Sequence, residues 1–210
     1  FDVIIVGAGM SGTFMSSLLK EKKKSVLVIE KSSGIGGRFS TKPIGSQIVD
    51  YGCQYIKPKT ATSVRLAGKL ENLGLLSEIN LDTNKRVFIA PFGMNKIPQY
   101  FSRNTRVLTN AFVNRISHKK TGWEVYTDAG IFSSTSVVLT MPIAQVETLL
   151  RKSEIESFNL PKVDYLDFHT CTFISDIHSI DDVFNKNDLF PWICNNSKKG
   201  LRNTKNAFTA

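Results

Sequence analysis

The chain has 210 residues, of which 41% are hydrophobic and 21% are charged, a composition typical of a globular protein with a sizeable core. No apolar run approaches the roughly 20 residues of a membrane-spanning helix, and the first apolar segment continues into a glycine motif, which argues against a signal peptide. The net charge of +9 does not predict a nucleic-acid partner, because the lysines are spread along the chain without interleaved aromatic residues.

The cysteines and lysines give two further expectations. Cys53, Cys171 and Cys194 are widely spaced and form neither a CxxC pair nor a metal-ligand cluster with the three histidines. We therefore expect reduced thiols, a cytoplasmic location and no metal site. The excess positive charge has two open interpretations: solvated loops, such as residues 22–24, or attraction of a polyanionic small molecule such as a dinucleotide.

The first elements in chain order form a strand–helix–strand pattern. An apolar, β-branched run at residues 3–6 continues directly into Gly-x-Gly-x-x-Gly, and residues 13–20 follow with a helical pattern. A second apolar run at residues 26–29 ends on Glu30. This order of strand, glycines, helix, strand and acid predicts a dinucleotide-binding βαβ unit.

Each glycine of the motif has its own role in such a unit. Gly7 allows the tight turn from strand to helix, Gly9 lets the backbone approach a pyrophosphate, and Gly12 lets the helix pack closely on the strand. Met10 and Ser11, between Gly9 and Gly12, are expected to contact the cofactor, and the N-terminus of the following helix offers free N–H groups and a partial positive charge to phosphate oxygens.

Glu30 lies eighteen residues after Gly12, where a carboxylate can accept both ribose hydroxyls of an adenosine. Lys31, its neighbour, is expected to join the cofactor-binding residues. Two positions depart from the usual motif: Thr13 replaces a common aliphatic residue, and Lys23 stands where glycine often precedes the second strand. Neither is expected to touch the phosphate-binding backbone.

A second glycine-rich loop follows six to seven residues after Glu30 and ends in Arg38. The backbone amides of Gly36 and Gly37 can face an anion, and the guanidinium of Arg38 can clamp it through two parallel hydrogen bonds. Alone, such a loop would be interpreted as a surface connection. Beside the first motif it predicts a second phosphate contact.

Glu30 followed by Gly36-Gly37-Arg38 resembles the flavoprotein family of amine oxidases, phytoene desaturases and protoporphyrinogen oxidases, which bind FAD. The resemblance narrows at residues 50–56, Asp-Tyr-Gly-Cys-Gln-Tyr-Ile, which are similar to the Asp-x-Gly-Ala-Gln-Tyr-Ile segment of the renalase group, with Cys53 in place of the alanine. Three later segments are also similar to that group: residues 90–94, 139–142 and 195–199.

This resemblance implies roles for several residues. FAD would be the cofactor, with Gln54 and Tyr55 setting the environment of its flavin. The backbone of Val113 would meet the adenine, and Met141 would lie in the segment that returns the chain to the nucleotide site.

The rest of the chain alternates between short helices and strands. The alternation at residues 123–127 and the turns around it predict an antiparallel meander, which the resemblance places against the parallel sheet. His169, inside a predicted strand, is a candidate substrate-facing side chain, although strand histidines are more often structural. Helices are predicted at residues 60–74, 95–101 and 143–150, and strands at 86–90, 106–109, 111–117, 123–127, 131–132, 136–139, 165–177 and 206–210.

The expected fold class is α/β: a Rossmann-like FAD/NAD(P)-binding domain with an antiparallel β-meander, plus an inserted substrate-type α+β region. The FAD-binding domain is expected at residues 1–56 and 105–150, and the substrate or roof domain at 57–104 and 151–210. The resembled family has a later Gly-Asp segment that binds the FAD diphosphate, and none occurs before Ala210. The second domain is therefore expected to be incomplete at its C-terminus.

Three functions remain open. The first is a renalase-like oxidoreductase that passes hydride from an isomeric dihydronicotinamide dinucleotide to FAD, with O2 as acceptor. The second is an amine oxidase or desaturase, and the third is a truncated, non-catalytic nucleotide-binding module. The sequence shows no Ser-His-Asp, metal or paired-carboxylate pattern, so no catalytic residue is assigned; a flavin would supply the chemistry.

Overall fold

The computed structural model describes the chain except residues 81–85, 156–158, 177–183, 186–191 and 202. The chain divides into two compact units. Unit 1 consists of Phe1–Gly37 and Pro98–Asp167, and unit 2 consists of Arg38–Ile97 and Phe168–Ala210.

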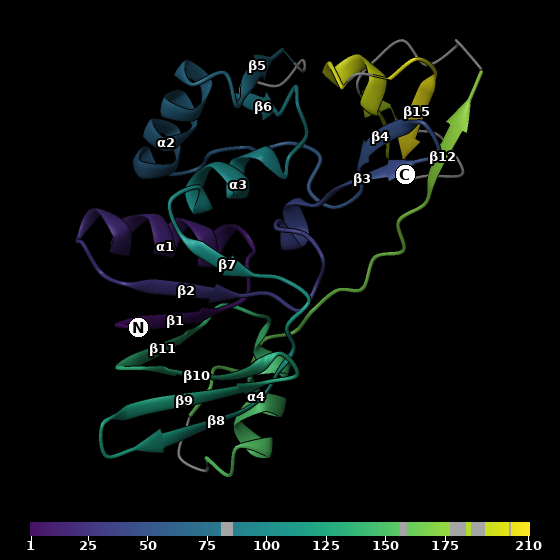
Figure 1. Cartoon of the computed structure of the whole chain (residues 1–210). Helices are drawn as coiled ribbons and strands as arrows, with labels where there is room; N and C mark the ends of the chain where they lie inside the picture. The colour runs from purple at the N-terminus through teal and green to yellow at the C-terminus, as the bar shows by residue number, and fades with distance from the viewer. Residues whose placement is uncertain (81–85, 156–158, 177–183, 186–191, 202) are drawn as a thin grey trace. The chain divides into compact units, whose positions relative to one another are not determined.

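Unit 1 is built on a parallel sheet with the strand order β11-β1-β2-β7 (Figure 1). β1 and β2 are apolar and nearly fully buried, as parallel strands covered on both faces must be. Helix α1 (Met10–Glu21) connects them, and its Leu19 packs on a cluster with Ile5 and Val28. The four strands are β1 (Val3–Val6), β2 (Val26–Ile29), β7 (Arg106–Leu108) and β11 (Ser136–Leu139).

The opposite face of this sheet is covered by an antiparallel meander and by helix α4 (Ile143–Lys152). Ile4 and Leu27 alternate with the residues that face α1, and they share a core with Ile116 of the meander and Val146 of α4. The meander and the helix after Pro142 are thereby confirmed. The meander strands are β8 (Val113–Lys119), β9 (Gly122–Thr127) and β10 (Gly130–Ser134).

Unit 2 combines a small antiparallel sheet, in the order β12-β15-β14-β13, with the hairpins β3–β4 and β5–β6 (Figure 1). Helix α2 (Ala61–Asn72) begins after Thr60, which forms a capping box with Ser63, and Gly74 follows the helix with φ +70°. The strands are β3 (Thr41–Ile44), β4 (Gln47–Asp50), β5 (Ser77–Ile79), β6 (Val87–Ile89), β12 (Thr172–Ser175), β13 (Phe184–Asn185), β14 (Ile193–Asn195) and β15 (Asn206–Thr209).

Two 3-10 turns and one helix complete the chain: η1 (Gly37–Phe39), η2 (Asn196–Lys199) and α3 (Lys96–Ser102). The unit boundary falls inside α3, after Ile97. This division into compact units falls after residues 37, 97 and 167, whereas the domain boundaries expected from the sequence are at 56, 104 and 150. Residues 38–56 belong to unit 2 because the β3–β4 hairpin packs on β15 and η2.

The strand predicted at residues 165–177 is also wrong over most of its length. Residues 161–170 have no regular structure and are exposed, with Leu166 84% and Phe168 81% accessible to solvent. Pairing begins only where the amide of Cys171 donates to the carbonyl of Ala210 (2.8 Å) and continues through β12. The period-2 pattern of residues 165–170 did not suffice for a strand, because a strand also needs a neighbouring strand to pair with.

Candidate dinucleotide-binding site

The carboxyl ends of β1, β2, β7 and β11 meet at one edge of the parallel sheet, because all four strands run in the same direction. Gly7 follows β1, Glu30 follows β2 and Thr140 follows β11. The backbone of Glu30 donates to Leu108 (2.8 Å) and accepts from Ala111 (3.0 Å), which ties the segment after β7 to the same edge. Open α/β sheets bind their ligands at this edge.

The turn from β1 into α1 shows why Gly7 and Gly12 are needed. Gly7 has φ +107°, a conformation that side chains disfavour. A Cβ atom on Gly12 would lie 2.0 Å from the carbonyl oxygen of Gly7, so the helix can approach the strand only without a side chain there. A Cβ atom on Gly9 would meet nothing closer than 4.0 Å, which leaves space beside the start of the helix.

The N-terminus of α1 carries free amide groups. The amide of Thr13 donates to the carbonyl of Gly9 (3.0 Å), the first bond of the helix. By helix geometry, the N–H groups of Met10, Ser11 and Gly12 have no acceptor within the helix. Together with the helix dipole they form a site suited to an anion.

The two unusual residues of this motif behave differently. Thr13 is fully buried, and its hydroxyl donates to the carbonyls of Gly9 (3.0 Å) and Met10 (3.2 Å). The expectation that Thr13 does not touch the phosphate-binding backbone is therefore wrong, because a threonine hydroxyl in a helix can bond to the carbonyl four residues earlier. Lys23 lies in the turn beyond the other end of α1, with φ +58°.

The carboxylate of Glu30 is fixed by the surrounding backbone. Its Oε2 accepts from the amide of Ala8 (2.8 Å) and its Oε1 from the amide of Ser32 (2.8 Å), while the residue remains 8% exposed. Each carboxylate oxygen keeps a further lone pair with which it can accept a hydroxyl. Lys31 is exposed and its Nζ lies 3.5 Å from Gln145 Oε1 of α4.

The structure brings the second glycine loop to the first. Gly36 forms a parallel bridge with Gly9, and its amide donates to the carbonyl of Ala8 (3.0 Å). Gly37 has φ +56°, and a Cβ atom there would lie 3.1 Å from the Cα of Gly9. The loops predicted separately to contact phosphate are thus adjacent.

The segments after β11 and before β8 also reach this edge. The hydroxyl of Thr140 bonds to the carbonyls of Val6 (2.9 Å) and Gly7 (3.1 Å) and so holds the β11 exit against the glycine turn. Met141 comes next and packs on the core that contains Val113. Thr140 was not among the predicted cofactor-binding residues, although it lies in the segment at residues 139–142 that was expected to return the chain to the nucleotide site.

The remaining predicted residues belong to unit 2. Arg38 is exposed, and its carbonyl accepts from the amide of Cys53 (2.8 Å). A Cβ atom on Gly52 would lie 2.3 Å from the same carbonyl oxygen, so the glycine loop and the residue 50–56 segment are in direct backbone contact. His169 lies in the exposed stretch without regular structure, outside these contacts.

Gln54 and Tyr55 differ in what they expose. Gln54 is buried, and its amide nitrogen donates to the carbonyls of Asp50 and Gly52, the latter at 3.2 Å. Tyr55 is 39% exposed, and the ammonium of Lys57 lies 5.0 Å from the centre of its ring. Tyr55 is therefore the more accessible of the two.

A buried ion pair in unit 2 was not predicted. Lys199 donates to Asp50, and both side chains are fully buried. Burial raises the pKa of two nearby thiols, that of Cys53 and that of Cys194, the latter to about 12, so both thiols are neutral at pH 7. Asp50 and Lys199 lie in the segments 50–56 and 195–199, which resemble the same family. This shared resemblance was the sequence feature that could have indicated the pair.

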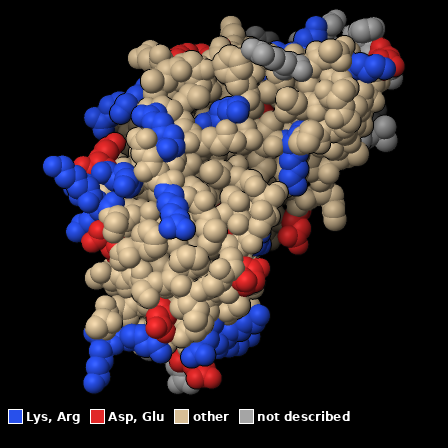
Figure 2. Space-filling model, viewed as in Figure 1, with Lys and Arg blue, Asp and Glu red and all other residues tan. Residues whose placement is uncertain are grey.

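Two further features were considered as possible sites: the charged side chains on the face shown in Figure 2, and groups of metal-ligating side chains among the described residues. On the face shown in Figure 2, Lys and Arg side chains form separate groups with acidic residues between them, unlike the continuous band that nucleic-acid binding favours. Among the described residues, no three His, Cys, Asp or Glu side chains gather as metal ligands, and no helix is long and apolar enough to cross a membrane.

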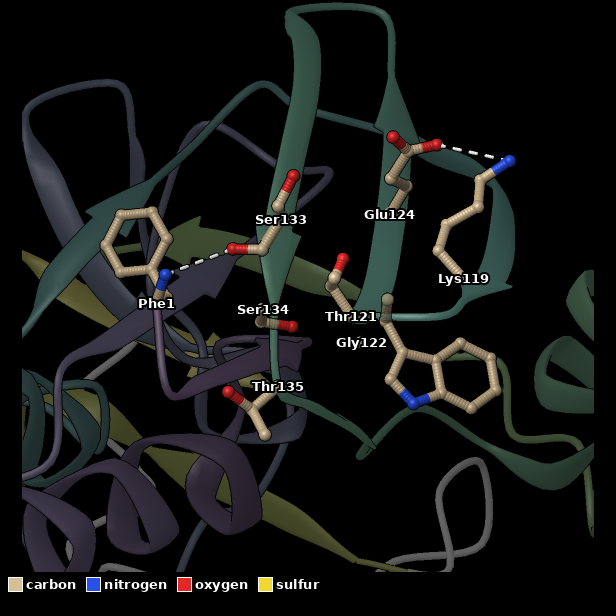
Figure 3. Close-up of a pocket in the computed structure, with 9 residues that line it drawn as sticks. Phe1, Lys119, Thr121, Gly122, Glu124, Ser133, Ser134 and Thr135 are labelled. Atoms are coloured by element: carbon tan, nitrogen blue, oxygen red, sulfur yellow. Dashed lines mark hydrogen bonds and ion pairs between the residues drawn. The ribbon is translucent and has the colours of Figure 1, made fainter.

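A pocket lies at the opposite end of β1 from the glycine turn (Figure 3). It is lined by Phe1, whose amino group donates to the carbonyl of Ser133 (3.0 Å), and by residues of the β8–β9 and β10–β11 turns. Lys119 and Glu124 on its rim pair with each other at 3.5 Å. These internal contacts give no indication of a ligand.

Comparison with known proteins agrees with the geometry of the sheet edge. Residues 5–69 match the family model of the NAD(P)-binding Rossmann-like domain. This part of the chain is similar to such a domain. The match covers both glycine loops and Glu30.

Relatives extend the similarity along the chain. Renalase of Mus musculus is 28% identical over 163 residues, 69% of this chain and 48% of that protein. The flavin-containing amine oxidase of Oncorhynchus mykiss is 41% identical over 68 residues, 32% of this chain and 13% of that protein. The chain thus spans about half or less of these relatives' lengths and is similar to the amine oxidase and flavin oxidoreductase superfamily.

Solved structures support the fold. Wild-type putrescine oxidase bound to putrescine superposes with a TM-score of 0.65 at 14% identity, covering 100% of this chain and 74% of that chain. The likeness confirms the α/β Rossmann-like class.

Proposed function

We propose that the chain belongs to a renalase-like, FAD-dependent oxidoreductase that oxidises a dihydronicotinamide-type dinucleotide with O2 as acceptor. The observation that carries the proposal is the carboxylate of Glu30, which the amides of Ala8 and Ser32 hold at the end of β2 beside the free N-terminus of α1. The similarity to the flavin-containing amine oxidase of Oncorhynchus mykiss supports a flavin such as FAD as the resident cofactor.

The residues at the sheet edge fit an adenosine diphosphate group. The free amides of Met10, Ser11 and Gly12 suit a pyrophosphate, and the space beside Gly9 lets it approach. Glu30 suits the ribose hydroxyls. Further contacts with FAD would come from Gly7, Lys31, Gly36, Gly37, Arg38, Gln54, Tyr55, Val113 and Met141.

The bound cofactor would supply the capacity to accept a hydride and pass electrons to O2. The chain's own residues would bind, orient and exclude water, and no protein acid or base is assigned to the reaction. His169, exposed in unit 2, stays a candidate for substrate contact. A cytoplasmic location is part of the proposal, since Cys53, Cys171 and Cys194 are free thiols.

An amine oxidase is the second candidate. The 41% identity with the flavin-containing amine oxidase of Oncorhynchus mykiss favours it. That identity covers only 32% of this chain, whereas the renalase similarity covers 69%, so the renalase-like function has the broader support. A non-catalytic nucleotide-binding module is the third candidate.

The experiment that separates them is anaerobic reduction of the FAD-loaded protein. Bleaching of the flavin absorbance by 2- or 6-dihydro-NAD(P) isomers, with no bleaching by putrescine or benzylamine, is the expected result. Bleaching by the amines alone would favour an amine oxidase. A protein that takes up FAD but is bleached by neither class would favour the non-catalytic module.

A further inference from the structure

One buried carboxylate connects three segments of unit 2. One oxygen of Asp50, at the end of β4, accepts from the fully buried ammonium of Lys199 in η2. Its other oxygen accepts from the hydroxyl of Thr41 (2.5 Å) and from the amide of Met94 (2.8 Å) in the turn before α3. The carboxylate is therefore fully engaged by groups that are distant in sequence.

Lys199 also reaches the segment that follows Asp50. Its Nζ lies 3.5 Å from Gln54 Oε1, while the amide nitrogen of Gln54 donates back to the carbonyls of Asp50 and Gly52. Gln54 is thus held at both ends of its amide. The turn of residues 50–54 folds around this buried group.

The same turn carries the backbone contact with Arg38. The amide of Cys53 donates to the carbonyl of Arg38 (2.8 Å), and Gly52 lies so close to that carbonyl that a Cβ atom would be 2.3 Å away. The thiol of Cys53 bonds to the carbonyl of Tyr55 (3.1 Å), which fixes the turn on its other side. A change in the turn would therefore displace the backbone of Arg38.

A fully buried ion pair is not required for stability, because well-packed apolar residues of similar volume are often equally stable. Its geometry is nevertheless specific, since each charge must meet its partners. We propose that Lys199 is a positioning residue: with Asp50 it holds residues 50–54 in the turn that fixes the backbone of Arg38, a residue that the proposed function assigns to cofactor binding. The cofactor in this statement rests on the proposed function, whereas the placement of Arg38 does not.

Hydrogen exchange of the full chain tests the placement without any cofactor. The variant D50N/K199M removes both charges without leaving one unpaired, and K198M at the exposed neighbour is the matched control. We expect exchange of the Cys53 amide to rise about tenfold in D50N/K199M, with Ile5 and Val28 in unit 1 unchanged, and no change in K198M. Unchanged exchange at Cys53, or an equal rise in unit 1, would overturn the proposal.

FAD titration then tests the consequence. We expect D50N/K199M to weaken FAD binding about tenfold, and Arg38→Ala to cause a much smaller further loss in D50N/K199M than it causes in the wild-type chain. Fully additive losses would overturn the coupling between Lys199 and Arg38. A wild-type chain that binds no FAD would instead refute the proposed function, and the exchange at Cys53 would still decide the placement.

Discussion

The glycine turn of unit 1 and the Asp50–Lys199 pair of unit 2 are held by different kinds of interaction. In the turn, backbone contacts backbone within six residues, and the absence of side chains at Gly7 and Gly12 is what permits the contact. In unit 2, two charged side chains 149 residues apart meet in a fully buried position. The glycine turn therefore has no room for an added side-chain atom, and the buried pair is destabilised when one of its two charges is removed alone.

The largest expected effect comes from breaking the charge pair on one side. Lys199→Met leaves the carboxylate of Asp50 buried without its cation, which should lower the free energy of unfolding by about 3–5 kcal/mol. D50N/K199M should recover most of that loss, and K198M should stay within about 0.5 kcal/mol of wild type. Urea denaturation measures all three, and a double variant as unstable as Lys199→Met would contradict this account.

The glycine turn should respond almost as strongly to one methyl group. In Gly12→Ala the added Cβ atom would lie 2.0 Å from the carbonyl oxygen of Gly7, so the turn must open. We expect this to lower the free energy of unfolding by about 3 kcal/mol. Gly34→Ala is the control, because a Cβ atom there meets nothing within 4 Å. Thermal unfolding of the two variants measures the difference, and equal melting temperatures would show that the turn is not tightly packed.

Glu30 tests whether the sheet edge binds a ribose. Glu30→Ala removes the acceptor for the hydroxyls and should weaken FAD binding by about 1.5–3 kcal/mol, roughly 10- to 150-fold. Glu147→Ala, at an exposed position of α4, should bind FAD as wild type does. Fluorescence titration gives both constants. Equal affinities for the two variants would remove Glu30 from the site.

The pH dependence of stability tests whether the thiol of Cys194 is buried in unit 2. Because burial raises its pKa from 9.0 to about 12, the unfolded chain ionises this thiol first, and stability is lost as pH rises from about 9 towards 12. The loss attributable to Cys194 should approach about 1.4 kcal/mol per pH unit in that window. Cys194→Ala should lack this component, so denaturation curves at pH 8, 9 and 10 for both proteins check it. Parallel pH dependence would mean that the thiol is accessible.

Thr13 gives the smallest expected change. Thr13→Val keeps the buried shape but removes the hydroxyl that bonds to the carbonyls of Gly9 and Met10. Since the amide of Thr13 still donates to Gly9, the loss should be only about 0.5–1 kcal/mol in urea denaturation. A loss above about 2 kcal/mol would show that the hydroxyl, rather than the backbone, holds the turn.

The difference between local contacts and contacts over long sequence distances also explains which features the sequence could predict. Residues 3–30 were predicted in order because every feature of the βαβ unit is local: an apolar strand, glycines, a helix and a terminal acid. The meander followed from alternation and from glycine turns near Gly122 and Gly130. Both signals need only neighbouring residues.

Features that depend on distant partners were missed. Residues 165–170 were predicted as part of a strand but form none, because pairing begins only at Cys171. Lys199 stands in a polar run and would be expected on the surface, yet Asp50 draws it into the interior. The division between compact units after residue 37 likewise depends on contacts between β4 and β15.

The central claim is that the edge of the unit 1 sheet binds the adenosine diphosphate half of FAD. Competition between nucleotides for the purified chain tests it most directly. We predict that ADP displaces bound FAD and that FMN, which lacks the adenosine, does not bind at comparable concentrations. Binding of FMN as tight as that of FAD, with no displacement by ADP, would contradict the claim.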